Sequence, residues 1–460
     1  MSIQQVTDIQ SRGMRLRTPR HALAHVPGED GWPIIGSTFE LLADPKGFVE
    51  KMAKRFGPVY RNRALGDTAV VLLGPEANEF FLLDPQKVLS SEAGWGFILG
   101  KLFPRGLMLL DFDEHRLHRR ALSVGFKAGP MRSYLELLNA GMAANLSKWP
   151  RGAEMRVYPA MKELTLNLAG ASFLGLQLGP DTEPLIKALS AMIAAAVAPI
   201  RATLPGTKMR EGVKARAYVV DYFKRQIPAR RESGGEDLFS HLCRATYEDG
   251  SFLTDQDVAD HMNFFIMAAY DTVTSSLTTL VHRLAANPQW QEAVRDEHFG
   301  QGARPGVPLS YDKLESIPLT EMAFKEAMRM VPPVPSIPRR AVRDFEFSGI
   351  KIPAQTLVNI NPLYTHYMPD IWPEPESYDP MRFTEEASRK RHRYAYIPFS
   401  GGAHMCLGLN FAYMQAKCFA WHFLSSVRVS IEEGYRPKWN MWPIPFPRDG
   451  LRVMLSAVGS

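Results

Sequence analysis

The residue types and spacing best suited to chemistry surround Cys406, in the segment Phe399-Ser-Gly-Gly402-Ala-His404-Met-Cys406-Leu-Gly408. A thiolate that binds a metal must be accessible to it, sheltered from water and held by backbone N–H groups. The glycines allow a tight turn and a close approach to a flat ligand. The residues that follow have a helical pattern, so Cys406 precedes a helix N-terminus, where the dipole favours a negative sulfur. The segment predicts a metal-binding cysteine; the alternative is an ordinary buried cysteine beside a glycine-rich turn.

Asp271 and Thr272 form a second chemical pair, in the middle of a predicted helix over residues 254–286. This helix would be roughly 50 Å long, and residues 264–269 are apolar on all its faces, as in a buried helix. A carboxylate and a hydroxyl there are costly without partners. The small side chain of Ala268, one turn earlier, leaves room for a flat ligand. The pair predicts a proton relay; the alternative is a solvent-facing Asp-Thr step.

Two further sets of polar side chains share helix faces. Glu326 and Arg329 are three residues apart, and His115 and Arg119 are four apart, so each pair lies on one face. Such pairs are common on solvated surfaces, where they contribute little. By themselves they predict nothing specific.

Together these motifs resemble the cytochrome P450 family. The cysteine segment is similar to its haem-binding loop, and residues 268–272 are similar to a segment of its long central helix, with Ala269 where glycine is usual. The resemblance extends from a Pro/Gly-rich lead-in at 27–36 to strands near 445–456. It implies a mainly α fold with small β-sheets, the triangular helical prism of that family. We expect one domain over 1–460, with 1–24 as a flexible N-terminal segment.

The resemblance also implies a cofactor, haem b, with Cys406 as the axial ligand of the iron. His115, which stands where many relatives have tryptophan, would hold the haem propionates together with Arg119, Arg339 and His404. The further expected cofactor contacts are Phe399, Gly402, Gly408 and Ala268. Glu326, Arg329 and Arg382 would form a buried charge network that supports the cysteine loop.

The implied activity is that of a monooxygenase, which activates O2 and inserts one oxygen atom into a hydrophobic organic substrate, with Asp271 and Thr272 delivering protons. The substrate would be terpenoid-, steroid- or fatty-acid-like. The predicted substrate pocket consists of Trp95, Phe97, Leu99, Phe264, Phe265, Val334, Ile337 and Phe446. A haem-thiolate isomerase or dehydratase that does not activate O2 and a haem-based sensor are the alternatives.

The composition indicates the class of protein and the compartment in which it works. Three cysteines without close spacing argue against a disulfide scaffold. No run approaches the ~20 apolar residues of a membrane span, and there is no signal-peptide core. We therefore expect a soluble, cytoplasmic protein of prokaryotic type without a transmembrane anchor. The net charge of +6 comes with no nucleic-acid-binding motif.

The electrons would come from a separate ferredoxin or flavodoxin. We expect this acidic protein to dock on a basic face made by residues 388–393, Arg116 and Arg120. An ordinary solvated charge run is the alternative for 389–393.

The periodicity predicts helices at 41–56, 75–83, 113–127, 131–148, 161–174, 181–197, 210–230, 254–286, 288–298 and 319–330. A hairpin is expected from 58–65 and 68–73, joined by Gly66-Asp67. Short strands are expected near 345–347 and 356–360. Residues 95–103 are expected in a loop.

Overall fold

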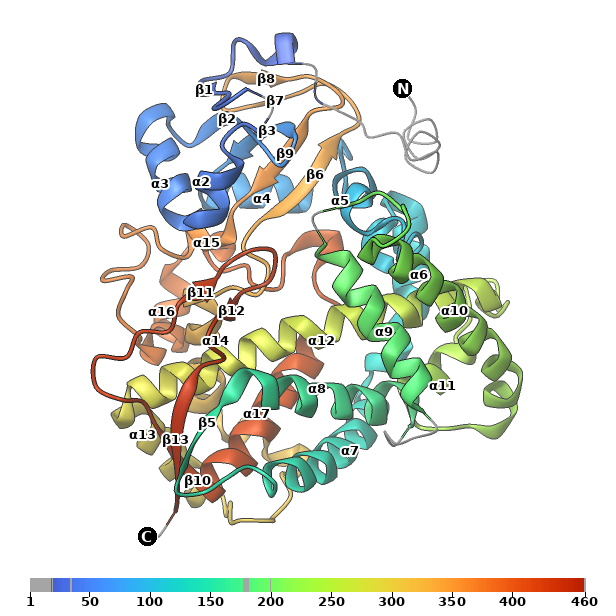
Figure 1. The fold of residues 1–460 in the computed structure, drawn as a ribbon, viewed down its shortest axis with the longest axis vertical. Coiled ribbons are helices and arrows are strands. Elements are labelled where there is room, and N and C mark those ends of the chain that lie inside the picture. Colours follow the sequence, from blue (N-terminus) through green and yellow to red (C-terminus); the bar gives the residue numbers. More distant parts are fainter. Residues whose placement is uncertain (1–17, 19, 34, 177–181, 199, 459–460) are drawn as a thin grey trace.

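The computed structural model describes residues 18, 20–33, 35–176, 182–198 and 200–458, and helices dominate it (Figure 1). The prediction of a mainly α chain with small sheets is confirmed. The α-helices are α2 (Thr38–Ala43), α3 (Pro45–Phe56), α4 (Pro75–Leu83), α5 (Ser91–Leu99), α6 (Phe112–Leu122), α7 (Ala128–Leu146), α8 (Val157–Leu174), α9 (Glu183–Ala196), α10 (Lys208–Ser233), α11 (Leu238–Cys243), α12 (Asp255–Ala286), α13 (Pro288–Gly300), α14 (Pro318–Met330), α15 (Pro362–Thr365), α16 (Glu385–Lys390) and α17 (Leu409–Ser426).

The strands form one larger sheet at one end of the molecule and several small ones (Figure 1). The larger sheet has the order β1-β2-β3-β9-β6-β4, and a three-stranded sheet has the order β10-β13-β5. Two further pairs are β11-β12 and β7-β8. The strand bounds are β1 (Gly28–Glu29), β2 (Val59–Ala64), β3 (Asp67–Leu72), β4 (Leu89–Ser90), β5 (Ala153–Arg156), β6 (Ile337–Ala341), β7 (Phe345–Phe347), β8 (Ile350–Ile352), β9 (Leu357–Ile360), β10 (Val427–Ser430), β11 (Trp439–Asn440), β12 (Phe446–Pro447) and β13 (Arg452–Ala457).

The predicted hairpin forms from β2 and β3, which pair antiparallel. Its turn lies one residue earlier than expected, at Leu65-Gly66 rather than Gly66-Asp67. Both Leu65 and Gly66 have positive φ, at 53° and 79°. This is the combination that a two-residue turn needs to match the twist of the two strands.

Helix α12 runs through the middle of the molecule and contacts α8, α10 and α14 (Figure 1). It begins where the Thr254 side chain accepts a hydrogen bond from the Asp257 N–H, at 3.1 Å, and it ends before Pro288. Among the described helices, α12 alone is long and apolar enough by composition to cross a membrane, but 67% of its most apolar window is buried inside the protein. It is the core helix that the sequence predicts.

The single helix expected at 41–56 is two helices, and this prediction is wrong. The chain leaves helical geometry at Asp44, with φ −145° and ψ 84°, and α3 starts at Pro45. A proline disfavours helical geometry in the residue before it. The Asp44 side chain then caps α3 by accepting a hydrogen bond from the Gly47 N–H at 3.0 Å.

The prediction of a loop at 95–103 is also wrong for its first half, because these residues form the end of α5. The Ser90 side chain caps this helix by accepting from the Ala93 N–H at 2.8 Å. Gly94 brings α5 against β6, because a Cβ at Gly94 would lie 2.6 Å from the Arg339 Cα. Packing against the sheet stabilises a helix whose two glycines lower its intrinsic propensity.

The prediction that the segment 1–24 is flexible is wrong for its last residues. Residues 1–17 and 19 lie outside the described part. Thr18 is buried: its N–H donates to Asp67 and its hydroxyl accepts from the Leu357 N–H, both at 3.0 Å. Leu23, in a short 3-10 helix, is fully buried in the core beneath the larger sheet.

Candidate functional site

The loop that carries Cys406 has a fixed backbone. Gly402 has φ +60°, and a Cβ there would lie 2.0 Å from the Leu82 carbonyl oxygen, so only glycine fits. The Cys406 N–H donates to the Phe399 carbonyl at 2.9 Å, which closes the loop. Gly408 has an ordinary φ of −86° and directly precedes α17. The structure therefore places Cys406 just before a helix N-terminus, as the sequence predicts.

The surroundings of the Cys406 thiol are protein rather than bulk water. Cys406 has accessible surface, yet burial raises the pKa of its thiol, while the Gly408 N–H and the charge of Arg119 lower it. We infer that the accessible face opens on an enclosed space inside the protein. A cysteine in such a space fits a metal ligand, because a bound cation offsets the desolvation of the thiolate.

Four predicted cofactor contacts lie together next to this loop. The rings of His115 and His404 are 4.0 Å apart between centroids. Burial lowers the pKa of His404 well below its usual value, and His115, Arg339 and Arg119 lower it further. Burial also lowers the pKa of His115 to about 4, with Arg119 and Arg339 adding to the effect. Arg119 and Arg339 lower the pKa of both histidines, so α6, β6 and the cysteine loop bring the four groups to one place.

One of the two arginines in this cluster has no acidic partner among the described residues. Burial lowers the pKa of Arg119, and Arg119 forms no ion pair with any acidic side chain that the structure describes. The carboxylates nearest Arg339 are Asp84 and Asp111, and both accept backbone N–H bonds, from residues 88–89 and 91–92. Two buried carboxylates, such as haem propionates, fit this set of donors.

The middle of α12 has accessible side chains, although the helix is buried on both sides of it. Residues 267–269, 271 and 272 are half-buried, whereas their neighbours on both sides are buried. The Thr272 hydroxyl donates to the Ala268 carbonyl at 2.6 Å. Burial raises the pKa of the Asp271 carboxyl, and the charge of Lys162 lowers it. Asp271 and Thr272 therefore face a sheltered space.

Lys162 lies on α8 and was not foreseen from the sequence. Its ammonium group lies 5.5 Å from the ring centre of Tyr158 and 5.4 Å from that of Tyr270. Asp271 in turn raises the pKa of both tyrosines, after burial. Nothing in the local sequence around residue 162 marks it, because its partner is 109 residues away.

Glu326, Arg329 and Arg382 meet in one buried network. Arg329 donates to both carboxylate oxygens of Glu326, at 2.7 and 2.9 Å, and both side chains are fully buried. Arg382 Nε lies 3.3 Å from Glu326 without the alignment of a hydrogen bond. Arg329 also donates to the carbonyls of His366 and Pro375, at 2.8 Å each. The network connects α14 to the segment before the cysteine loop.

The two predicted pocket residues on α12 pack in different directions. The Phe264 ring meets that of Phe103 edge-on at 6.4 Å. The Phe265 ring lies 6.2 Å from that of Phe126, and Phe126 is 3.8 Å from the position of a Cβ at Gly408. Phe265 therefore packs on the side of the cysteine loop, and we assign it to the core rather than to a substrate pocket.

The other predicted pocket residues come from three regions. Leu99 and Ile337 are core residues, 6% and 8% exposed, whereas Phe97 is 40% exposed. Trp95 and Val334 are half-buried, on α5 and just before β6. Phe446 stacks on Tyr158 at 5.5 Å, and the charge of Asp271 raises the pKa of this tyrosine after burial.

The expected basic face is partly neutralised by its own pairs. Arg389 and Lys390 pair with carboxylates four residues earlier on α16, and Arg391 lies 4.4 Å from the ring centre of Trp372. On α6, Arg116 pairs with Asp113 at 3.4 Å. Exposed ion pairs are weak, so Arg116, Arg389 and Lys390 remain available to another protein.

A sheltered cysteine, a cluster of buried donors beside it and an accessible step in the central helix fit a haem-binding site. Comparison with known proteins agrees: the sequence model of the family described as Cytochrome P450 matches residues 26–450. The chain belongs to the cytochrome P450 family, whose cofactor is haem, and the predicted resemblance is confirmed.

Relatives cover nearly the full chain. A "Putative cytochrome P450 136" of Mycobacterium tuberculosis is 36% identical over 448 residues, which are 95% of this chain and 89% of the relative. A "Taxane 10-beta-hydroxylase" of Taxus cuspidata is 30% identical, over 93% and 89%. The solved structure "Retinoic acid bound cyanobacterial CYP120A1" superposes with a TM-score of 0.84 at 27% identity, over 94% of this chain and 99% of that one. The predicted fold is confirmed.

Proposed function

We propose that this protein is a haem-thiolate monooxygenase that inserts one atom of O2 into a hydrophobic, isoprenoid-type substrate. The observation that carries the proposal is the accessible Asp271–Thr272 step in the middle of α12, between two buried stretches of that helix. When bound, haem b supplies O2 binding and activation, and Cys406 is the residue suited to hold its iron. His115, Arg119, Arg339 and His404 are suited to hold its carboxylates, and Ala268, Phe399, Gly402 and Gly408 are the expected contacts of its ring.

Proton delivery is the step that this chain's own residues perform on the α12 side. The Thr272 hydroxyl donates its proton to the Ala268 carbonyl. The lone pairs of the hydroxyl oxygen therefore remain free to accept a hydrogen bond from a proton donor. Asp271, beside it, has a raised pKa because it is buried, which suits a carboxyl that picks up and releases protons. This arrangement supports oxygen activation over an isomerase, a dehydratase or a sensor, none of which needs a proton supply at this point. Reductase-dependent O2 consumption with oxygen incorporated into product separates these functions.

Thr272→Ala is expected to uncouple electron use from product. Product formed per electron consumed should fall by about one to two orders of magnitude, with hydrogen peroxide released instead, because protons are no longer delivered in order. The matched control is Thr279→Ala: Thr279 makes the same bond to a carbonyl four residues earlier, at 2.9 Å, but is fully buried. Coupling that stays normal in Thr272→Ala, or falls equally in Thr279→Ala, contradicts the assigned role.

Lys162→Gln is expected to move the pH profile of coupling to higher pH. The Lys162 charge lowers the pKa of Asp271, so its removal raises that pKa further and Asp271 stays protonated to higher pH. Coupling is measured from about pH 5 to about pH 9. Lys148→Gln is the control, because Lys148 is exposed. An unchanged profile shows that Lys162 does not act on the relay.

The substrate class rests on the pocket and on the relatives. Trp95, Val334 and Phe446 are half-buried apolar side chains, as expected for a hydrophobic ligand. The names of similar proteins mention taxane, beta-amyrin and retinoic acid, which are all isoprenoid-derived. We therefore place terpenoids before steroids and fatty acids. A screen of these three classes for the spectral shift of substrate binding, followed by turnover, tests the order.

The electron donor is proposed to be a separate acidic ferredoxin or flavodoxin. Arg116, Arg120 and residues 389–393 are the candidate docking groups. Four of them, Arg116, Arg120, Arg389 and Lys390, pair with exposed carboxylates that a protein partner can replace. The cytoplasmic location stays a prediction.

A further inference from the structure

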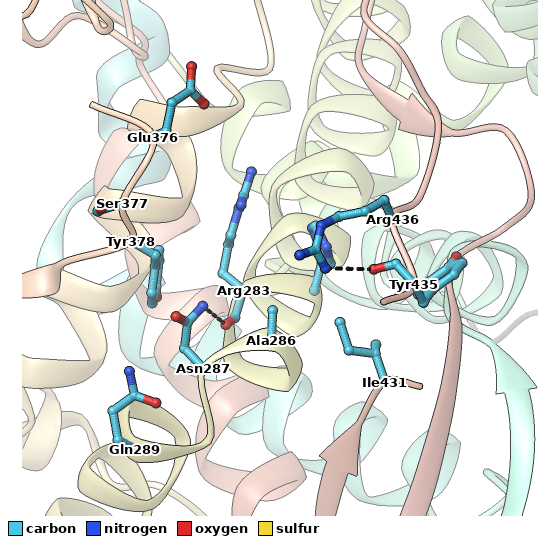
Figure 2. Close-up of a pocket in the computed structure, with 11 residues that line it drawn as sticks. Arg283, Ala286, Asn287, Gln289, Glu376, Ser377, Tyr378, Ile431, Tyr435 and Arg436 are labelled. Atoms are coloured by element: carbon cyan, nitrogen blue, oxygen red, sulfur yellow. Dashed lines mark hydrogen bonds between the residues drawn. The ribbon is translucent and has the colours of Figure 1, made fainter. Parts of the chain in front are cut away.

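A polar pocket of about 460 Å³ lies where α12 ends and α13 begins. Its other walls are residues 376–378 and the segment 431–436 after β10. Figure 2 shows Arg283 extending into the space between these two segments, with Arg436 at the opposite wall. Arg283 is eleven residues beyond Thr272, which is about 16 Å along the helix. The pocket is therefore separate from the Asp271–Thr272 step.

The pocket contains two cationic side chains without counter-charges. Neither Arg283 nor Arg436 forms an ion pair with an acidic side chain in the part of the chain that the structure describes. Arg283 Nε is buried without a hydrogen-bond partner in the described chain. Among the described residues, Arg436 donates only to the carbonyl of its neighbour Tyr435, at 3.2 Å. Among the residues that line the pocket, Glu376 is the single acid, and it is already paired with Lys46.

A third donor lies beside the two arginines. His282 is 7% exposed, and its Nδ1 has no hydrogen-bond partner. Burial lowers the pKa of His282 to about 3, and Arg283 and Arg436 lower it further. The imidazole is therefore neutral at physiological pH, and it has an N–H to donate.

The other acids nearby are occupied. The charge of Asp449 raises the pKa of His282, but Asp449 already accepts a hydrogen bond from the Tyr435 hydroxyl at 2.6 Å. The charge of Glu326 raises the pKa of Arg283, but Glu326 already forms an ion pair with Arg329. No described acidic side chain remains to neutralise the two arginines, so an anion from outside fits best.

We propose that this pocket binds a phosphate group, held by Arg283, Arg436 and His282. The donors line the pocket from two elements, α12 and the 431–436 segment, and a tetrahedral phosphate offers oxygens in several directions, whereas a carboxylate offers two in one plane. The volume lies in the range of small-molecule sites and leaves room for the rest of a phosphorylated molecule. The assignment is independent of the reaction at Cys406.

The test is a titration of the haem-loaded protein with inorganic phosphate at low ionic strength, followed by calorimetry and by the shift in thermal unfolding temperature. We expect saturable binding that Arg283→Gln and Arg436→Gln each weaken by at least about tenfold. Arg448→Gln is the matched control, because Arg448 is exposed and does not line the pocket. Arg436 is also exposed, so its variant should fold even if Arg283→Gln does not.

A second arm identifies the source of the phosphate. Vesicles that contain phosphatidic acid are tested for co-sedimentation with the same variants. Free phosphate that binds with the expected dependence on Arg436 indicates a soluble ligand, and binding to vesicles alone with that dependence indicates a lipid headgroup. Absence of binding in both arms, or an equal loss in Arg448→Gln, overturns the proposal.

Discussion

Replacing Cys406 by serine is expected to abolish monooxygenase activity and the spectral signature of thiolate ligation. The hydroxyl of serine remains protonated in a site whose burial already raises the pKa of the native thiol, so it cannot supply the anionic ligand. The variant should still fold, because the loop is fixed by Gly402 and by the Cys406 N–H bond to Phe399, neither of which the substitution changes. The measurement is the absorption spectrum together with product formation.

The other two cysteines are the natural controls. Cys243 and Cys418 are both fully buried, and burial raises the pKa of the Cys243 thiol to about 12. Cys243→Ser should leave the thiolate spectrum unchanged in the folded protein. A thiolate spectrum that survives in Cys406→Ser, or disappears in Cys243→Ser, would assign the ligand to another residue.

Removing the carboxylate of Glu326 is expected to lower the free energy of unfolding by about 3–5 kcal/mol, because Arg329 is left as a buried charge without a partner. Glu326→Ala should also lower haem content, since Arg329 ties α14 to the carbonyls of His366 and Pro375 in the segment before the cysteine loop. Chemical denaturation and the haem-to-protein absorbance ratio measure the two effects.

Glu385→Ala is the control for this second prediction. Glu385 pairs with Arg389 four residues later on α16, with both side chains exposed, and should change stability little. Equal effects of Glu326→Ala and Glu385→Ala would show that the buried network does not support the fold.

The parts of the site that the sequence predicts are those whose determinants are local. The cysteine loop needs Gly402 and a helix start within a few residues, and the pair Glu326–Arg329 lies on one helical turn. The effect of Lys162 on the pKa of Asp271 joins residues 109 apart in the sequence. The placement of Arg283 and Arg436 in one pocket depends on how the segment after β10 folds back on α12. Both follow from tertiary packing, which no local pattern encodes.

The errors in the fold have similar causes. Helix α5 contains Gly94 and Gly96, which lower helix propensity, but Gly94 is what allows the helix to pack on β6. The break at Asp44 could have been predicted, because Pro45 follows it. Phe265 has the composition of a pocket residue, and only its contact with Phe126 places it on the other side of α12.

The most direct test of the account is the absorption spectrum of the purified, haem-loaded protein after reduction and exposure to carbon monoxide. If Cys406 binds the iron as a thiolate, the Soret band of the carbonyl complex moves to the long wavelength that is specific to cysteine ligation. A native, folded sample whose band stays where histidine-ligated haem proteins absorb would contradict the proposed site.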